Sequence, residues 1–202
     1  MITVKQLSFG YTRRRNIFDS LSLELPKGSI VGLLGRNGEG KTTLLKLLYG
    51  QLLRRQGELK VLDADPKHRA VSFLQQVYLL PEEFQVPPIS IRSFFDISAP
   101  FYPNYDEAVA KELIDIFGLQ WDMNLKKISQ GQKKKALIAF ALSLRVPLLL
   151  LDEPTNGLDI PSKGEFRRTV ARYTTEEQTI IISTHQVRDL EQLIDRIYFR
   201  YF

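Results

Sequence analysis

The chain has 202 residues, a net charge of +5 at pH 7 and no cysteine, so disulfides, thiolate metal sites and thiol catalysis are excluded. Its length fits one domain with room for a subdomain. No apolar run approaches the 18 residues of a membrane-spanning helix, and the N-terminus alternates like a strand rather than a signal peptide. The basic clusters are short and lack interleaved aromatics, so no nucleic-acid partner is expected.

The first part of the chain predicts short strands around one glycine-rich loop. Apolar residues alternate with polar ones at 2–7 and at 21–25, and a continuous apolar run follows a Pro-Lys-Gly turn. The expected elements are strands at 2–7, 21–25, 30–34, 59–62 and 70–74, and a helix from the glycine loop to about Leu53.

Prolines and aromatic residues mark a change in composition after Pro81. Two helical patterns then appear, at 107–117 and 132–144. The remaining elements are expected as a strand at 147–151, a helix from Pro161, a strand at 179–183, a helix at 187–194 and a strand at 196–201. Alternating strands and helices favour an α/β domain with a mainly parallel sheet.

The segment Gly35–Thr42 fits the P-loop pattern G-x-x-x-x-G-K-[ST]. A buried strand precedes it and a helical run follows, so backbone N–H groups and the positive end of a helix dipole would surround a phosphate. Lys41 would reach the β- and γ-phosphates, and the Thr42 hydroxyl would bind Mg²⁺. The candidate nucleotide-binding residues of this segment are Gly35, Asn37, Gly38, Gly40, Lys41, Thr42 and Thr43.

An apolar strand ends in two carboxylates at Asp152 and Glu153. Ligands bind at the carboxyl edge of open α/β sheets, and ionised acids are costly there unless they hold a cation or do chemistry. We expect Asp152 to hold Mg²⁺ and Glu153 to act as the base that deprotonates an attacking water. The alternative, that both acids only cap the next helix, loses weight beside a P-loop.

With these two motifs in place, the chain resembles the ATP-binding subunit of an ATP-binding cassette (ABC) transporter, in order over nearly its whole length. Further matching positions are the adenine-stacking aromatic, the Q-loop glutamine, the signature motif, the D-loop and the switch histidine. These are Tyr11, Gln76, Ile128–Gln132, Gly157–Asp159 and His185. A P-loop alone fits many ATPase families, whereas a Ser-x-Gly-Gln element before the acidic strand and a histidine after it fit essentially one.

The resemblance implies a P-loop NTPase fold with an N-terminal antiparallel β subdomain and an inserted helical subdomain at 84–145, between core segments 1–83 and 146–202. It also implies roles for residues that, taken alone, have ordinary structural readings. Tyr11 would stack on adenine, Gln76 would touch Mg²⁺ or water, His185 would contact the γ-phosphate, and Asp159 would communicate across a dimer. The register of the glutamine is ambiguous, because Gln75 precedes it.

Ser129 stands as an N-cap before a helix, with Gly131 and Gln132 beside it, which makes a second site where an anion meets a helix N-terminus. By resemblance, it completes the ATP site of a second copy or a paralogue, arranged head to tail. Gln130 departs from the family, which usually has glycine there, and relatives usually continue beyond Phe202.

The resemblance therefore implies a Mg²⁺-dependent ATPase that powers a membrane permease from the inner face of the cell membrane. The residues expected to catalyse ATP hydrolysis are Lys41, Gln76, Glu153 and His185. The stretch Phe101–Asp106 is similar to one in cassettes of small exporter systems, which favours export. A soluble ABC-type ATPase without a permease is the alternative. We expect most aromatics of the insert to fill its core, with two or three free to form a docking patch.

Overall fold

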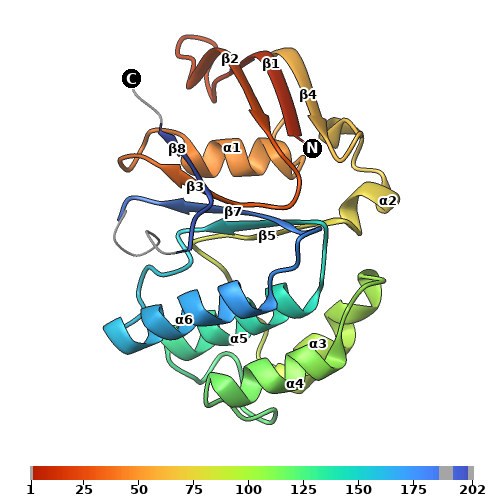
Figure 1. Ribbon diagram of the computed structural model, residues 1–202, viewed down its shortest axis with the longest axis vertical. Coiled ribbons are helices and arrows are strands. Elements are labelled where there is room, and N and C mark those ends of the chain that lie inside the picture. The colour runs from red at the N-terminus through yellow and green to blue at the C-terminus, as the bar shows by residue number, and fades with distance from the viewer. Residues whose placement is uncertain (1, 187–192, 200–202) are drawn as a thin grey trace.

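The computed structural model describes residues 2–186 and 193–199, and places two sheets and several helices in layers (Figure 1). The strands are β1 (Ile2–Phe9), β2 (Phe18–Leu25), β3 (Ile30–Leu34), β4 (Gln56–Val61), β5 (Val77–Leu80), β6 (Leu148–Asp152), β7 (Thr179–Thr184) and β8 (Arg196–Phe199). The helices are α1 (Lys41–Leu48), α2 (Val71–Leu74), α3 (Ile91–Ser98), α4 (Glu107–Ile116), α5 (Gln130–Ser143) and α6 (Ile160–Tyr173), with 3-10 turns at Pro66–His68 and Ala99–Phe101.

The larger sheet has the strand order β5-β6-β7-β3-β8, and all of its pairings are parallel. The smaller sheet, β2-β1-β4, is antiparallel and is held away from the larger one by α1 (Figure 1). Helices α5 and α6 cover the opposite face of the larger sheet, with α3 and α4 beyond them (Figure 1). The predicted fold, a parallel core with an N-terminal antiparallel part and a helical insertion, is confirmed.

The two faces of β6 feed two separate hydrophobic cores, because successive side chains on a strand point in opposite directions. Leu148 and Leu150 pack with the leucines of α1 and with the smaller sheet. Leu149 and Leu151 pack with the helices of the other face. All four leucines are at most 1% exposed. A continuous apolar run is therefore what a strand covered on both faces requires.

Several expected elements have different limits or another form. The predicted strand at 70–74 is wrong: this stretch is α2, and the strand lies at Val77–Leu80, where it pairs with β6. A short apolar run does not by itself distinguish helix from strand, and here the amides of Phe73 and Leu74 both bond to the Ala70 carbonyl.

Helix α1 ends at Leu48 rather than near Leu53, because Gly50 takes a left-handed φ of +76° and its amide bonds to the carbonyl of Leu47. Helix α3 was not predicted, although Ser90 caps it by accepting from the Ser93 amide. Residues 187–192 of the predicted helix 187–194 lie outside the residues that the structure describes. The predicted strand 196–201 is found as β8 at Arg196–Phe199, and its last two residues are also not described.

The aromatic residues of the helical insertion meet around Phe140, which is 1% exposed. Its ring lies edge-on to those of Phe94, Phe95 and Tyr78, with centroids 5.1, 5.0 and 5.7 Å away. Phe84, Tyr102 and Tyr105 also pack against this core. Phe101, by contrast, is 69% exposed. Most of these aromatics therefore fill the core, as expected from the sequence.

Phe140→Ala should lower the free energy of unfolding by about 3–5 kcal/mol, since it removes a buried ring and leaves a cavity. Phe101→Ala, a matched change at an exposed position, should alter it by less than about 0.5 kcal/mol. Urea unfolding of both variants would check this, and equal losses would contradict the assignment of Phe140 to the core.

Candidate functional site

The site lies at the carboxyl ends of three adjacent parallel strands, β6, β7 and β3. The P-loop follows β3, Asp152 ends β6 with Glu153 directly after it, and His185 follows β7. Because parallel strands end at the same edge of a sheet, segments more than 100 residues apart in the chain meet there. This edge is where an α/β sheet binds ligands.

The P-loop turns sharply enough to need glycine at two positions. Gly38 and Gly40 have φ of +86° and +88°, a region that residues with side chains rarely adopt. Gly40 is also the N-cap of α1, and no side chain caps this helix end. The unpartnered amides of the first turn are therefore open to an anion, which fits the predicted phosphate site.

Lys41 has its ammonium inside this loop. Its Nζ donates to the carbonyls of Gly35 and Arg36, at 2.7 and 3.2 Å, and lies 3.5 Å from Glu153 Oε1. The side chains of Lys41 and Glu153 are only 8% and 5% exposed. The structure thus places a fixed positive charge between the P-loop backbone and the predicted base.

Asp152 is 2% exposed and is held through both carboxylate oxygens. Thr42 Oγ1 donates to Oδ2 at 2.8 Å, and Ser183 Oγ donates to Oδ1 at 2.6 Å. Hydroxyl and carboxylate oxygens are the ligands that Mg²⁺ prefers, so Thr42 and Asp152 fit the predicted ion. Within the described ranges no group of three or more His, Cys or acidic residues could hold a metal, so the ion's other ligands would come from phosphate and water.

Glu153 combines a strained backbone with a carboxylate that is only partly satisfied. Its φ is +44°, and its amide bonds to Ser183 Oγ at 3.0 Å. Its Oε2 lies 3.0 Å from His185 Nδ1, whereas the buried Oε1 has no hydrogen-bond partner. The side-chain amide nitrogen of Gln186 lies 3.1 Å from His185 Nε2. Because this nitrogen can only donate, Nε2 accepts, and the ring proton lies on Nδ1, from which it is donated to Glu153.

Other predicted residues lie outside this cluster. The side-chain amide of Gln76 donates to the Ser72 carbonyl at 2.7 Å, and Gln76 lies directly before β5. Tyr11 is 61% exposed, and its hydroxyl lies 3.2 Å from Thr43 Oγ1. Its ring is therefore open on the surface beside α1.

The signature residues form the N-terminus of α5, on the far side of the larger sheet from α1 (Figure 1). Ser129 Oγ accepts from the Gln132 amide, and Gln132 Oε1 accepts from the Ser129 amide, which is a reciprocal capping box. A Cβ added at Gly131 would lie 4.0 Å from the carbonyl oxygen of Gly157, in the D-loop. The helix end that would grip phosphate is thus well formed, but it lies away from the P-loop of its own chain.

Asp159 caps α6, a role that the sequence did not suggest. Its carboxylate accepts from the Ser162 amide at 2.9 Å, and hydrogen bonds from Ser162 lower the pKa of this exposed acid. Ser183 and Lys134 were also not singled out. Ser183 could have been noted as a hydroxyl at the end of the strand next to β6, whereas Lys134 carries no local signal.

The chain matches the model of the ABC transporter family over residues 18–156. The ABC transporter ATP-binding protein YtrB of Bacillus subtilis is 30% identical over 98% of this chain and 68% of its own length. The bacitracin transport ATP-binding protein BcrA of Bacillus licheniformis is 31% identical over 98% and 65%, respectively. A solved ATP-binding subunit of an ABC transporter is 25% identical, with a TM-score of 0.88 over 100% of this chain and 86% of that one.

The chain therefore spans about two thirds of the length of YtrB and BcrA. The family match covers the P-loop, the signature helix and the acidic end of β6, whereas Ser183 and His185 of the candidate site lie beyond the matched residues. This chain belongs to the ABC transporter family, as an ATP-binding subunit.

Proposed function

We propose that this chain is a Mg²⁺-dependent ATPase subunit that hydrolyses ATP to drive a membrane transporter. The observation that carries the proposal is the buried Glu153 carboxylate, which has one oxygen on His185 and the other without a hydrogen bond beside Lys41. A buried carboxylate oxygen that is ion-paired but accepts no hydrogen bond can accept one from water and then take its proton.

The residues divide the work of phosphoryl transfer. Lys41 and the P-loop amides neutralise charge on the β- and γ-phosphates, and Glu153 Oε1 orients the attacking water and takes its proton. His185 holds the other oxygen of Glu153 and so fixes the direction of the free one. Thr42 and Asp152 would hold Mg²⁺, which supplies additional positive charge at the phosphates.

One chain carries two halves of different ATP sites. The P-loop and the signature end of α5 lie on opposite sides of the larger sheet (Figure 1), so Ser129–Gln132 cannot close over the chain's own P-loop in this conformation. We infer a head-to-tail dimer, with a second copy or a paralogue, in which the signature of one chain covers the nucleotide of the other. Tyr11 stacks on adenine in this arrangement, and Gln76 and Asp159 respond to closure.

The transported substrate passes through an integral membrane permease, and the ATPase subunit docks on this permease at the inner face of the membrane. Among the described residues, none of the helices has the length and hydropathy needed to cross a bilayer. Phe101 and Ile97 of the helical insertion are 69% and 63% exposed, which suits a docking patch. Export is favoured by the Phe101–Asp106 stretch, which is similar to one in cassettes of small exporter systems.

Glu153→Gln should reduce ATP hydrolysis by about 100-fold or more, because the amide cannot accept the proton from water. The same variant should bind ATP and dimerise with it, since the P-loop and Ser129 are unchanged. Phosphate release and size-exclusion chromatography with Mg-ATP would measure both effects. Full hydrolysis by Glu153→Gln, or a monomer at saturating Mg-ATP, would contradict the proposal.

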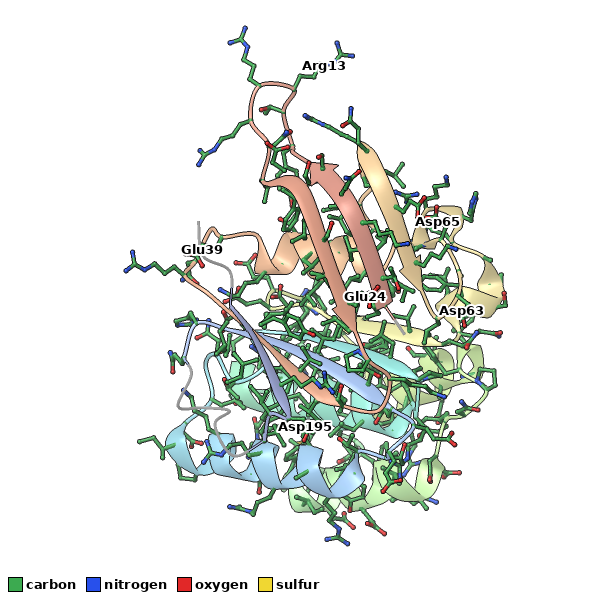
Figure 2. All side chains as sticks on the ribbon, turned by 45° about the horizontal axis from the view of Figure 1, so that its top comes forward. Arg13, Glu24, Glu39, Asp63, Asp65 and Asp195 are labelled. Carbon is green, nitrogen blue, oxygen red and sulfur yellow. The ribbon has the colours of Figure 1, made fainter. Side chains whose placement is uncertain are left out.

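A second carboxylate belongs to the P-loop itself, that of Glu39, which Figure 2 labels on this loop. Its Oε2 accepts from the Arg36 amide at 2.7 Å and fills the space against Gly35, where an added Cβ would lie 2.4 Å from it. The Glu39 carboxylate thus accepts a hydrogen bond from a loop amide, as a bound phosphate oxygen would. Glu39 therefore opposes nucleotide binding and has to leave when phosphate enters.

Glu39→Ala should lower the Kd for ATP by about three- to tenfold, because it removes a competing acceptor and a like charge. Glu58→Ala, which removes the same charge from an exposed position of β4, should leave Kd unchanged. Titration with a fluorescent ATP analogue would compare them. Weaker binding by Glu39→Ala, or an equal gain in both variants, would contradict this role.

A further inference from the structure

Lys134 is a lysine of the signature helix that is buried to 6% exposure. Its Nζ donates to the backbone carbonyl of Glu153 at 3.1 Å and to that of Asn156 at 2.9 Å. No carboxylate lies within ion-pair distance of Lys134 among residues 2–186 and 193–199. The ammonium thus binds main chain at the base of the predicted active site rather than neutralising an acid.

A lysine in this position is unfavourable for folding alone. Burial lowers its pKa, and the more distant Glu82, Glu153 and Asp152 oppose this effect. Backbone carbonyls only partly replace the water that a buried ammonium loses. A methionine or leucine would fill the same space at lower cost. A function for the two hydrogen bonds explains the buried charge better than stability does.

The residue that Lys134 holds is the one with strained backbone. A non-glycine residue at φ of +44° costs on the order of 1–3 kcal/mol and persists only when its neighbours hold it. Ser183 holds the amide side of Glu153, and Lys134 holds its carbonyl. The carboxylate direction depends on this backbone, because the side chain leaves from the atom between the two fixed groups.

Lys134 also shares a helix with the signature. Ser129 caps α5, and Lys134 follows five residues later, which is about 7.5 Å along the axis. A helix of this length moves as one body, so a shift of its N-terminus is passed to the Lys134 ammonium. Asn156 extends the connection, since its side-chain amide donates to Glu82 at 2.7 Å, in the segment after β5.

We propose that Lys134 is a positioning residue that ties the backbone of Glu153 to the signature helix of the same chain. This rests on the proposed ATPase function. Since the signature serves the partner's ATP and Glu153 serves the chain's own, the Lys134 contacts couple the two sites. Capture of the partner's nucleotide by Ser129 sets the position of Glu153 through Lys134.

Lys134→Met, which keeps the volume and removes the donor, should lower kcat by about tenfold or more with the Kd for ATP unchanged within about twofold. Lys134→Arg should recover most of kcat, because the adjoining cavity, with a volume of about 630 Å³, has room for the guanidinium. Lys133→Met on the same helix is the matched control and should behave as wild type. Urea unfolding of each variant separates a loss of fold from a loss of positioning.

A double-mutant cycle with Ser129→Ala tests the coupling. If Lys134 transmits the state of the signature, the double variant should be no slower than the slower single variant, whereas independent effects would multiply. An unchanged kcat in Lys134→Met, or multiplying effects in the cycle, would overturn the inference.

A measurement that does not depend on ATP hydrolysis distinguishes failure of the Lys134 inference from failure of the proposed ATPase function. Hydrogen exchange of the peptide 152–158 in nucleotide-free protein should be faster in Lys134→Met than in wild type and Lys133→Met. Unchanged exchange would overturn the inference even if the wild type hydrolysed no ATP. A wild type without hydrolysis, with exchange altered as expected, would instead reject the proposed function and retain the Lys134 clamp.

Discussion

The parallel pairing of β6, β7 and β3 is the constraint on which the rest of the structure depends. Each strand places its last residues at the same edge of the sheet, and β7 in the centre supplies Ser183, which bonds to both Asp152 and Glu153. Without this register the P-loop lysine and the acidic pair would have no common location. The pairing itself is secured by burial on both faces, which the leucines of β6 provide through separate cores.

The site keeps several charges in little water. Lys41, Asp152 and Glu153 are nearly buried. Lys41 donates to two P-loop carbonyls, the Asp152 carboxylate accepts from two hydroxyls, and one oxygen of Glu153 lies at hydrogen-bond distance from His185. Charges of opposite sign reduce the cost of burial for one another. One oxygen of Glu153 remains without a hydrogen bond, and Glu39 lies across a loop amide. These are the two points at which ATP and water would change the pattern of contacts.

The basic hairpin between β1 and β2 illustrates a feature that needs no function. Figure 2 shows Arg13 at the outer end of this hairpin, directed away from the body of the molecule, and its arginines are exposed. This cluster, Arg13–Arg15, is therefore a solvated surface, whereas Lys134 of the basic cluster Lys133–Lys135 is buried. The Arg54–Asp65 pair lies elsewhere in the same subdomain, with its two nitrogen–oxygen distances at 2.9 and 2.8 Å, and serves to fix the segment after β4.

Motifs with local causes could be read from the sequence. The glycines of the P-loop, the N-cap at Ser129 and the apolar run before Asp152 depend on φ angles, capping and burial, which neighbouring residues determine. The same local reasoning failed for 70–74, where a short apolar run suits either helix or strand, and it missed α3.

Other relations depend only on the packing of distant segments. His185 meets Glu153 because β7 lies beside β6, and Lys134 reaches the Glu153 carbonyl because α5 crosses beneath that strand end. Neither the strained φ of Glu153 nor the burial of Lys134 has a local signal in the residues around it. The sequence alone thus determined the chemical groups and the family pattern, and the tertiary structure decided which groups touch, since contact requires the sheet order and the helix packing.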